Sequence, residues 1–270
     1  DHQATAEAIA KRLGIINDDS KDHVMTGAEL NELSDEEFEK VVGHYSVYAR
    51  VSPEHKVRIV KAWQHQGKVV AMTGDGVNDA PSLNAADIGV AMGITGTDVA
   101  KGAADMILLD DNFTTIVQAV EQGRNIYANI KKSVIFLLSC NLGEVIAMFF
   151  VLVIGWQSPL LAIQLLWINL VTDSLPAIAL GMDQGEKDIM DEKPRNPKDG
   201  FFANGAGART IFFGILMGLA TIAAFYLGFA MHGAPIGGNN FATAEARTMA
   251  FITLVFAQLF FALSIRSEHE

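Results

Sequence analysis

The sequence predicts an α/β domain joined to an all-α membrane bundle of four transmembrane helices. Two observations support this. Strand-like and helix-like segments alternate through the first part of the chain, a pattern typical of a parallel sheet covered by helices. Half of the 270 residues are apolar and only 19% are charged. The charged residues lie mostly in 1–125, whereas 133–181 and 208–265 are nearly bare of them, so the chain divides into a soluble part and a membrane part.

The soluble part is expected to span residues 1–113. A helix at 4–13 stops at Gly14, and Ser34 with Glu37 three residues on has the pattern of a capping box at the start of a helix. The following segments read as strand, helix, strand, helix, strand and strand: 46–51, 52–67, 68–74, 80–86, 87–93 and 104–110. We expect these strands to form one parallel sheet covered on both faces.

The membrane part is expected to begin with a long helix, made of a cytoplasmic stalk at 114–132 that continues into a first span at 133–156. Further spans are expected at 160–181, 208–231 and 244–265, each near the roughly 20 residues needed to cross the hydrocarbon core. The 182–207 connector carries Lys187, Lys193, Arg195 and Lys198, whereas 155–159 and 232–243 carry no Lys or Arg. Residues 1–132 and 182–207 should therefore be cytoplasmic.

Composition excludes several classes of function. The net charge of −11 argues against nucleic acid as a partner. The single cysteine, Cys140, permits no internal disulfide and no paired-thiolate copper site, and the seven histidines show no zinc-site spacing. The short 232–243 connector and the lack of a targeting signal favour a bacterial plasma membrane.

A polar turn follows the strand at 68–74. Asp75, Asn78 and Asp79 are crowded into five residues after an apolar run. Carboxylates on such a turn, with phosphate oxygens, suit magnesium (Mg2+), and Lys56 at the start of a nearby helix suits phosphate charge. The alternative is an ordinary surface turn, in which Gly, Asp and Asn are common.

The predicted spans hold two carboxylates, Glu144 and Asp173. Asn141 precedes Glu144 by three residues, and Asn169 precedes Asp173 by four, so each pair shares a helix face. With Thr172 these side chains supply oxygen ligands for a hard cation, and Pro176 favours local unwinding that frees carbonyls. Interhelical hydrogen bonding is the alternative role, above all for Asn141 or Thr172 taken singly.

The stretch "MTGDGVNDAPSLNAADIGVAMG" resembles the hinge signature of type II P-type cation-transporting ATPases, whose phosphorylation domain belongs to the haloacid dehalogenase superfamily. "ARVSPEHK" and "LLDDNFTTIVQAVEQGRNIYANIKK" are similar to neighbouring segments of the family. The resemblance implies a Rossmann-type fold for 1–113 and the cofactors Mg2+ and ATP. The roles that it implies fall on Asp75 as magnesium ligand, Asn78 and Asp79 as parts of the phosphate pocket, Lys56 as a contact of the transferred phosphoryl group, and Gly74 and Gly76 as points of close backbone approach.

"SCNLGE" and "WINLVTDSLPA" resemble the fifth and sixth membrane helices of sarcoplasmic-reticulum-type calcium pumps. That resemblance implies calcium (Ca2+) ligands at Asn141, Glu144, Asn169, Thr172 and Asp173. Gln258 stands where those pumps have a glutamate in the eighth helix. Gln258 could therefore be a weak calcium ligand or form a helix–helix hydrogen bond, and the sequence favours neither role over the other.

The family's phosphorylated aspartate lies in a DKTGT motif, which does not occur in this sequence. We therefore expect a C-terminal fragment of an ATP-driven calcium exporter with a phosphoaspartate intermediate. Such a fragment is inactive alone because it lacks the nucleophile, and it binds ATP mainly through missing domains. Its expected partners are the transported cation, the lipid bilayer and the remaining domains of the pump.

Three alternatives stay open. The chain could be a half-pump or membrane regulator that assembles with a separate N-terminal part, or part of a pump for manganese, magnesium or sodium. A membrane-anchored phosphatase of the dehalogenase type is disfavoured. It would need the nucleophilic aspartate that this sequence lacks, and it gives no role to Glu144 and Asp173. If 114–156 is one helix, it can carry movement at the Asp75 turn to Asn141 and Glu144.

Overall fold

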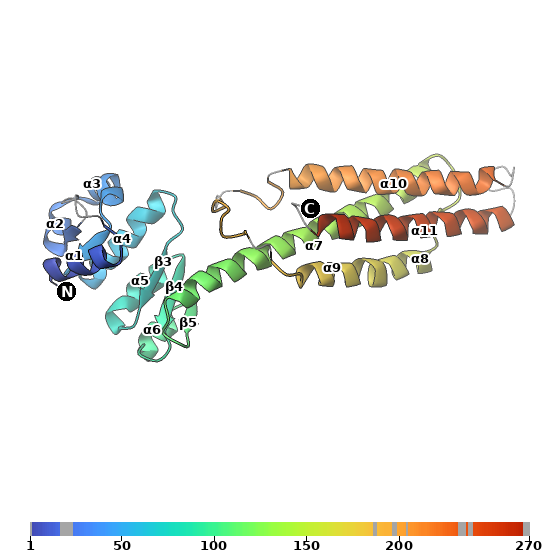
Figure 1. Ribbon diagram of the computed structural model, residues 1–270. Helices are drawn as coiled ribbons and strands as arrows, with labels where there is room; N and C mark the ends of the chain where they lie inside the picture. Colours follow the sequence, from blue (N-terminus) through green and yellow to red (C-terminus); the bar gives the residue numbers. More distant parts are fainter. Residues whose placement is uncertain are drawn as a thin grey trace. The chain divides into compact units, whose positions relative to one another are not determined.

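The computed structural model describes residues 2–16, 24–185, 188–195, 199–203, 205–231, 236 and 240–266. It divides into two compact units, Asp1–Gln118 and Ala119–Glu270. Figure 1 shows parallel strands and short helices in the first unit and long helices in the second. This agrees with the predicted α/β domain and all-α membrane bundle.

The first half of the first unit is mainly helical. Its elements are α1 (Gln3–Arg12), β1 (Val24–Thr26), α2 (Gly27–Glu32), α3 (Asp35–Val41), a 3₁₀ turn η1 (Val42–His44), β2 (Val47–Ala49) and α4 (Pro53–His65). Ser34 caps α3 together with Glu37, as its spacing predicts. Strands β1 and β2 pair in parallel, and their side chains join a core around Leu30, Phe38 and Val42.

The second half of the first unit holds a separate parallel sheet with the order β3-β4-β5. Its elements are β3 (Ala71–Gly74), a 3₁₀ turn η2 (Val77–Asp79), α5 (Ala80–Ala85), β4 (Ile88–Met92), α6 (Asp98–Ala103) and β5 (Met106–Leu108). Leu83, Ala91 and Ala100 form its core. This arrangement places the end of β3, and the turn that follows it, at an edge of the sheet.

The prediction of a single sheet is wrong, although the parallel pairing is confirmed. Strands β2 and β3 share no ladder, and the β1–β2 pair builds its own core with α3 and α4. Among the described residues β3 has a strand on one side only. Its outer edge therefore presents unpaired backbone groups.

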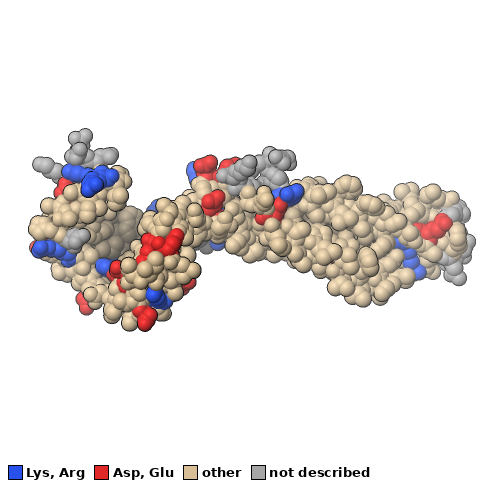
Figure 2. Space-filling view, turned by 60° about the horizontal axis from the view of Figure 1, so that its bottom comes forward, with Lys and Arg blue, Asp and Glu red and all other residues tan. Residues whose placement is uncertain are grey.

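The second unit is built from helices of very different length. They are α7 (Thr114–Val153), which begins in the first unit, α8 (Ala162–Trp167), α9 (Ser174–Gly181), α10 (Ala206–Ala230) and α11 (Asn240–Ile265). Helix α7 is continuous over 40 residues, as its pattern predicts. Four helical stretches in the described part of the chain are long and apolar enough to span a membrane. In Figure 2 the faces of these helices show few charges, whereas charges are scattered over the first unit.

Helices α10 and α11 pack closely against each other (Figure 1). A Cβ added at Gly228 of α10 would lie 2.5 Å from the Cα of Ala246 on α11, so only glycine fits at this crossing. Phe225, Phe229 and Leu254 are fully buried nearby in the bundle core. Small residues at the crossing and large ones beside it are typical of membrane helix pairs.

The second span is not one regular helix. Between α8 and α9 the backbone forms a π-helical turn, η3 (Ile168–Asp173), which contains Asn169, Thr172 and Asp173. Pro176 has no N–H to donate to the carbonyl four residues before it, so the regular ladder is interrupted here. The sequence predicts local unwinding near Pro176, and the structure shows a π-helical turn there, in which the helix is wider than an α-helix.

The connector between α9 and α10 docks on α7. Arg124 of α7 donates to the carbonyls of Ile189 (2.9 Å) and Glu192 (3.0 Å). Arg195 donates to the hydroxyl of Tyr127 at 2.7 Å and lies over its ring. Lys187 and Lys198, which contribute to the predicted orientation, lie outside the described residues.

Candidate phosphate and cation sites

The polar turn after β3 is organised by one buried carboxylate, that of Asp79, which is 6% exposed. Its Oδ2 accepts the backbone N–H groups of Asp75 (3.3 Å) and Gly76 (3.1 Å). Its Oδ1 accepts the ammonium group of Lys56, which comes from α4. The turn and the helix that bears the lysine are therefore fastened together through Asp79.

Two opposing effects act on the pKa of Asp79. Burial raises it, but the hydrogen bond and charge of Lys56 and the N–H groups of Gly76 and Asp75 together hold the pKa below its usual value. Asp79 is thus an anion that is already paired within the turn. Its carboxylate positions Lys56 and the turn backbone relative to each other.

Gly74 makes this packing possible. A Cβ added at Gly74 would lie 2.4 Å from the Cβ of Asp79, far inside contact distance. At Gly76 the nearest atom to an added Cβ is Asp79 Oδ2 at 3.4 Å, an ordinary contact. Close backbone approach therefore requires glycine at Gly74, whereas the structure leaves room for a Cβ at Gly76.

Asp75 and Asn78 are exposed at the same turn. Among the described residues the carboxylate of Asp75 has no hydrogen-bond or ion-pair partner, while its backbone carbonyl accepts the N–H of Thr97 at 2.9 Å. An open carboxylate fits magnesium, which binds one or two carboxylates together with phosphate oxygens and waters. Within the described ranges no three acidic, His or Cys side chains cluster as a metal site, so this turn offers only part of a ligand set.

Sequence reasoning missed a residue that fastens the loop after β4, at the carboxyl ends of β4 and β5. Asp111 has a positive φ of 49°. Its carboxylate accepts the N–H groups of Gly93 (2.6 Å), Ile94 (3.0 Å) and Thr95 (2.8 Å). These hydrogen bonds, that of Ile94 above all, lower the pKa of Asp111 to about 2. The loop that it fastens leads to Thr97 and the Asp75 carbonyl, and paired acids after a strand ("LLDD") are the only sequence signal for it.

In the second unit three helical segments meet at Glu144 of α7. Its Oε2 accepts the amide N–H of Asn169 from the π-helical turn at 3.0 Å. Its Oε1 accepts the amide N–H of Gln258 from α11 at 3.2 Å. Glu144 is 6% exposed and Gln258 is fully buried. The structure therefore brings together residues that are as many as 114 positions apart in the sequence.

Asp173 is the most unusual group of this cluster. It is 2% exposed, and neither of its carboxylate oxygens has a nitrogen or oxygen hydrogen-bond donor, the weakly donating thiol of Cys140 being the side-chain donor beside it; the carbonyl oxygen of Gln258 is likewise buried and unpartnered. Thr172, beside Asp173 in the π-helical turn, is also buried. Buried carboxylates are costly unless paired or bound to a cation, so these orphaned oxygens fit a hard cation.

Asn141 is not part of this cluster. Its side chain is exposed and donates to the carbonyl of Leu137 at 2.8 Å, within its own helix. The three-residue spacing from Glu144 puts the two on neighbouring turns, but only Glu144 is held by the other helices. Cys140 is buried and free, with no second cysteine in the chain.

Comparison with known proteins gives matches at both ends of the chain. Residues 1–87 match the haloacid dehalogenase-like hydrolase family, and residues 157–270 match the C-terminus of cation-transporting ATPases. A calcium-transporting ATPase of Bacillus cereus is 53% identical over 99% of this chain and 31% of its own length. One of Bacillus subtilis is 54% identical over 99% of this chain and 29% of its own.

The chain is related to the P-type cation-transporting ATPases. A calcium-transporting ATPase of Lactococcus lactis is also similar, at 49% identity over the whole chain and 29% of its own length. This chain thus spans about 30% of the length of the curated relatives that it matches. The matches confirm the resemblance stated from the two signatures and the dehalogenase-like fold of the first unit.

Proposed function

We propose that this chain is the C-terminal part of a P-type calcium-transporting ATPase, which exports Ca2+ from the cytoplasm through a phosphoaspartate intermediate. The observation that carries the proposal is the buried Asp173, whose carboxylate oxygens have no nitrogen or oxygen hydrogen-bond donor. Relatives at about half identity over the whole chain are named calcium-transporting ATPases, which favours calcium as the cargo. The phosphorylated aspartate itself belongs to the missing part of the pump.

The transported cation binds between α7, the π-helical turn and α11. Ca2+ takes six to eight oxygen ligands, and the proposed donors are carboxylate, amide and hydroxyl oxygens. They come from Glu144, Asn169, Thr172, Asp173 and Gln258, whereas Asn141, whose side chain bonds its own helix, is left out of the set. Two carboxylates match the charge of a divalent ion, and its binding offsets the cost of their burial.

Gln258 has two tasks in this proposal. Its amide N–H holds Oε1 of Glu144 at 3.2 Å, and its unpartnered carbonyl oxygen is available as a neutral ligand. The helix–helix bond and the ligand role, which sequence leaves as alternatives, are thus compatible in one side chain. A neutral ligand at this position favours one tightly bound ion over two.

The turn after β3 serves the phosphoryl group. Asp75 would hold Mg2+, which when bound neutralises charge on phosphate oxygens. Lys56, whose side chain is 32% exposed although paired with Asp79, contacts the transferred group. Gly74, Gly76, Asn78 and Asp79 shape the pocket, and ATP is bound mainly by the missing domains.

Helix α7 couples the two tasks. It begins at Thr114, six residues after β5, and continues without interruption past Glu144. A rigid helix transmits displacement along its axis, so a change at the phosphate end shifts Glu144 against Asn169 and Gln258. The proposed placement is a bacterial plasma membrane, with 1–132 and 182–207 cytoplasmic.

Cation uptake by sealed vesicles that contain the full-length pump tests this proposal. Ca2+, Mn2+, Mg2+ and Na+ are compared in the wild type and in Asp173→Asn, with Glu245→Gln as a control that removes another acid from the same bundle. We expect ATP-driven uptake of Ca2+ alone, lost in Asp173→Asn and kept in Glu245→Gln. Uptake of a different cation, or undiminished Ca2+ uptake in Asp173→Asn, contradicts the proposal.

A further inference from the structure

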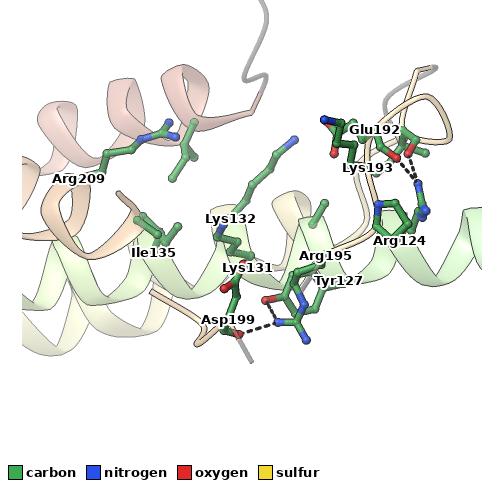
Figure 3. A pocket seen from close by; sticks show the side chains of 15 residues that line it. Arg124, Tyr127, Lys131, Lys132, Ile135, Glu192, Lys193, Arg195, Asp199 and Arg209 are labelled. Atoms are coloured by element: carbon green, nitrogen blue, oxygen red, sulfur yellow. Dashed lines mark hydrogen bonds between the residues drawn. The ribbon is translucent and has the colours of Figure 1, made fainter. Parts of the chain in front are cut away.

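A cavity of about 570 Å³ lies in the second unit, away from the cation cluster. Its walls come from α7, the connector between α9 and α10, the start of α10 and the end of α11. Figure 3 shows Arg209 at one end, Arg124 and Lys193 at the other, and Lys131 and Lys132 on α7 between them. Its volume falls in the range of small-molecule sites, about 300–1,000 Å³.

The lining of this cavity is strongly cationic. Among the described residues it contains two acids, Glu192 and Asp199, and six cations, which are Arg124, Lys131, Lys132, Lys193, Arg195 and Arg209. The chain as a whole carries a net charge of −11. A concentration of positive charge against that background favours an anionic ligand.

Four of the six cations have partners within the protein, Arg209 among them. Arg124 and Arg195 fasten the connector to α7, and Lys132 donates to the carbonyl of Arg266 at 2.8 Å. Lys131 and Lys193 differ, since within the described ranges neither ammonium group has a hydrogen-bond or ion-pair partner. Lys131 lies on α7 and Lys193 on the connector, so two different walls of the cavity each offer an ammonium group to a ligand.

The remaining walls are apolar and mark the edge of the membrane bundle. Ile135, Ala206 and Ile265 line the cavity. Ala206 is the first residue of α10, Ile265 is the last of α11, and Ile135 lies just inside the apolar stretch of α7. Cations next to these helix ends form an amphipathic site at the level where three spans leave the bilayer.

We propose that this cavity binds the phosphate-bearing headgroup of an anionic membrane lipid such as phosphatidylglycerol. Basic pockets between membrane helices on the cytoplasmic side suit anionic headgroups, and the apolar wall accepts the start of the acyl chains. A free phosphate ion has the same charge chemistry but makes no use of the apolar wall. The inference rests on the membrane placement proposed above and is independent of the transported cation.

Bound in this way, the lipid bridges α7 and the connector. Its phosphate contacts Lys131 on the proposed coupling helix and Lys193 on the connector, beside the Arg124 and Arg195 contacts. The headgroup therefore strengthens an attachment that the protein already makes. An anionic bilayer would then stiffen the cytoplasmic end of α7.

Native mass spectrometry of the full-length protein, in micelles with equimolar phosphatidylglycerol and phosphatidylcholine, measures this preference directly. We expect wild type to retain phosphatidylglycerol preferentially. Because each cation contributes about fivefold in affinity for an anionic surface, Lys131→Gln with Lys193→Gln should lower the preference roughly 25-fold. Lys131→Arg with Lys193→Arg should keep it, as should the matched charge-loss control, Lys61→Gln with Lys68→Gln in the first unit.

Two further measurements are needed. One distinguishes a lipid headgroup from a free phosphate ion, and the other keeps the test valid if the double variant does not fold. Millimolar inorganic phosphate or glycerol 3-phosphate should leave the retained lipid in place, and displacement by either would assign the cavity to a free anion and overturn the proposal. If the double glutamine variant does not fold, Lys193→Gln alone, on the exposed connector, should still lower the preference about fivefold. Equal retention in the lysine variants and in the first-unit control also overturns the proposal.

Discussion

Asp79 and Asp173 are both buried carboxylates, at 6% and 2% exposure, yet their surroundings are opposite. Asp79 accepts hydrogen bonds from Lys56 and from the N–H groups of Asp75 and Gly76. Asp173 accepts none from a nitrogen or oxygen donor. A buried carboxylate that the protein satisfies builds the shape of a site, whereas one that it leaves unsatisfied needs a ligand.

The same contrast appears between neighbours within each region. In the turn after β3 the paired Asp79 supports the open Asp75. In the bundle Glu144 is held by Asn169 and Gln258, next to the open Asp173. Each region thus combines a fixed carboxylate with an unpartnered one, on the surface in the first unit and in the interior in the second.

The largest difference between an unpartnered and a paired carboxylate is expected in the turn after β3, between Asp75 and Asp79. Asp75→Asn removes a carboxylate with no protein partner, so stability should change by less than about 0.5 kcal/mol. Phosphoenzyme formation by the full-length pump should nevertheless fall at least roughly 100-fold, because a metal ligand is lost. Asp79→Asn is the contrasting variant, and it should unfold about 1–3 kcal/mol more easily. Similar unfolding of the two variants would remove the distinction between them.

A second prediction concerns the packing under Asp79. Gly74→Ala forces a Cβ to within 2.4 Å of the Cβ of Asp79, and the resulting shift should cost about 1–3 kcal/mol of stability. Gly76→Ala, whose added Cβ makes an ordinary contact at 3.4 Å, is the matched control and should cost less. Thermal unfolding of both variants measures the difference, and equal costs would show that Asp79 does not depend on Gly74.

The third prediction tests the two tasks of Gln258. Gln258→Glu adds a charged oxygen beside Glu144 and Asp173, which should raise the affinity for Ca2+ about tenfold or increase the number of ions per phosphoenzyme. Gln258→Leu, which removes both the amide donor and the carbonyl, should lower the affinity. Calcium bound per phosphoenzyme is the measurement. An unchanged value in Gln258→Glu would count against a ligand role.

The smallest effect is expected at Asp111. Its pKa is lowered to about 2 in the folded protein by the N–H groups of the 93–95 loop, so its anion stabilises the fold above the unfolded pKa of about 4. This contribution is lost as pH falls from about 4 towards 2. Asp111→Asn, which tolerates the positive φ, should therefore lower the melting temperature at pH 7 and have little effect near pH 2. A constant difference across this range would assign the effect to something other than charge.

Local signals in the sequence were sufficient for much of this structure. The capping box at Ser34, the parallel strands, the turn at Asp75 and the continuous α7 each depend on residues close together in the chain. Glu144 and Asp173 stand out because acids are rare in apolar spans. The helical irregularity near Pro176 follows from one missing N–H.

What the sequence could not provide depends on long-range contacts. Hydrogen bonds of Asp111 to residues 16 to 18 positions earlier have no local pattern, and neither does the Gln258–Glu144 pair across 114 positions. Helical spacing placed Asn141 near Glu144 but did not show that Asn141 bonds its own helix. The division into two sheets likewise depends on which strands meet, a question that strand propensity does not answer.

Equilibrium binding of radioactive Ca2+ to the full-length pump in the absence of ATP tests the central claim most directly. Even outer-shell partners of a metal are worth 10–100-fold in affinity, so loss of a ligand in Asp173→Asn should weaken binding by more than ~100-fold. Asp75→Asn should bind Ca2+ as wild type does, because its carboxylate belongs to the phosphate turn. Wild-type affinity in Asp173→Asn would contradict the assignment of the buried carboxylates to the transported ion.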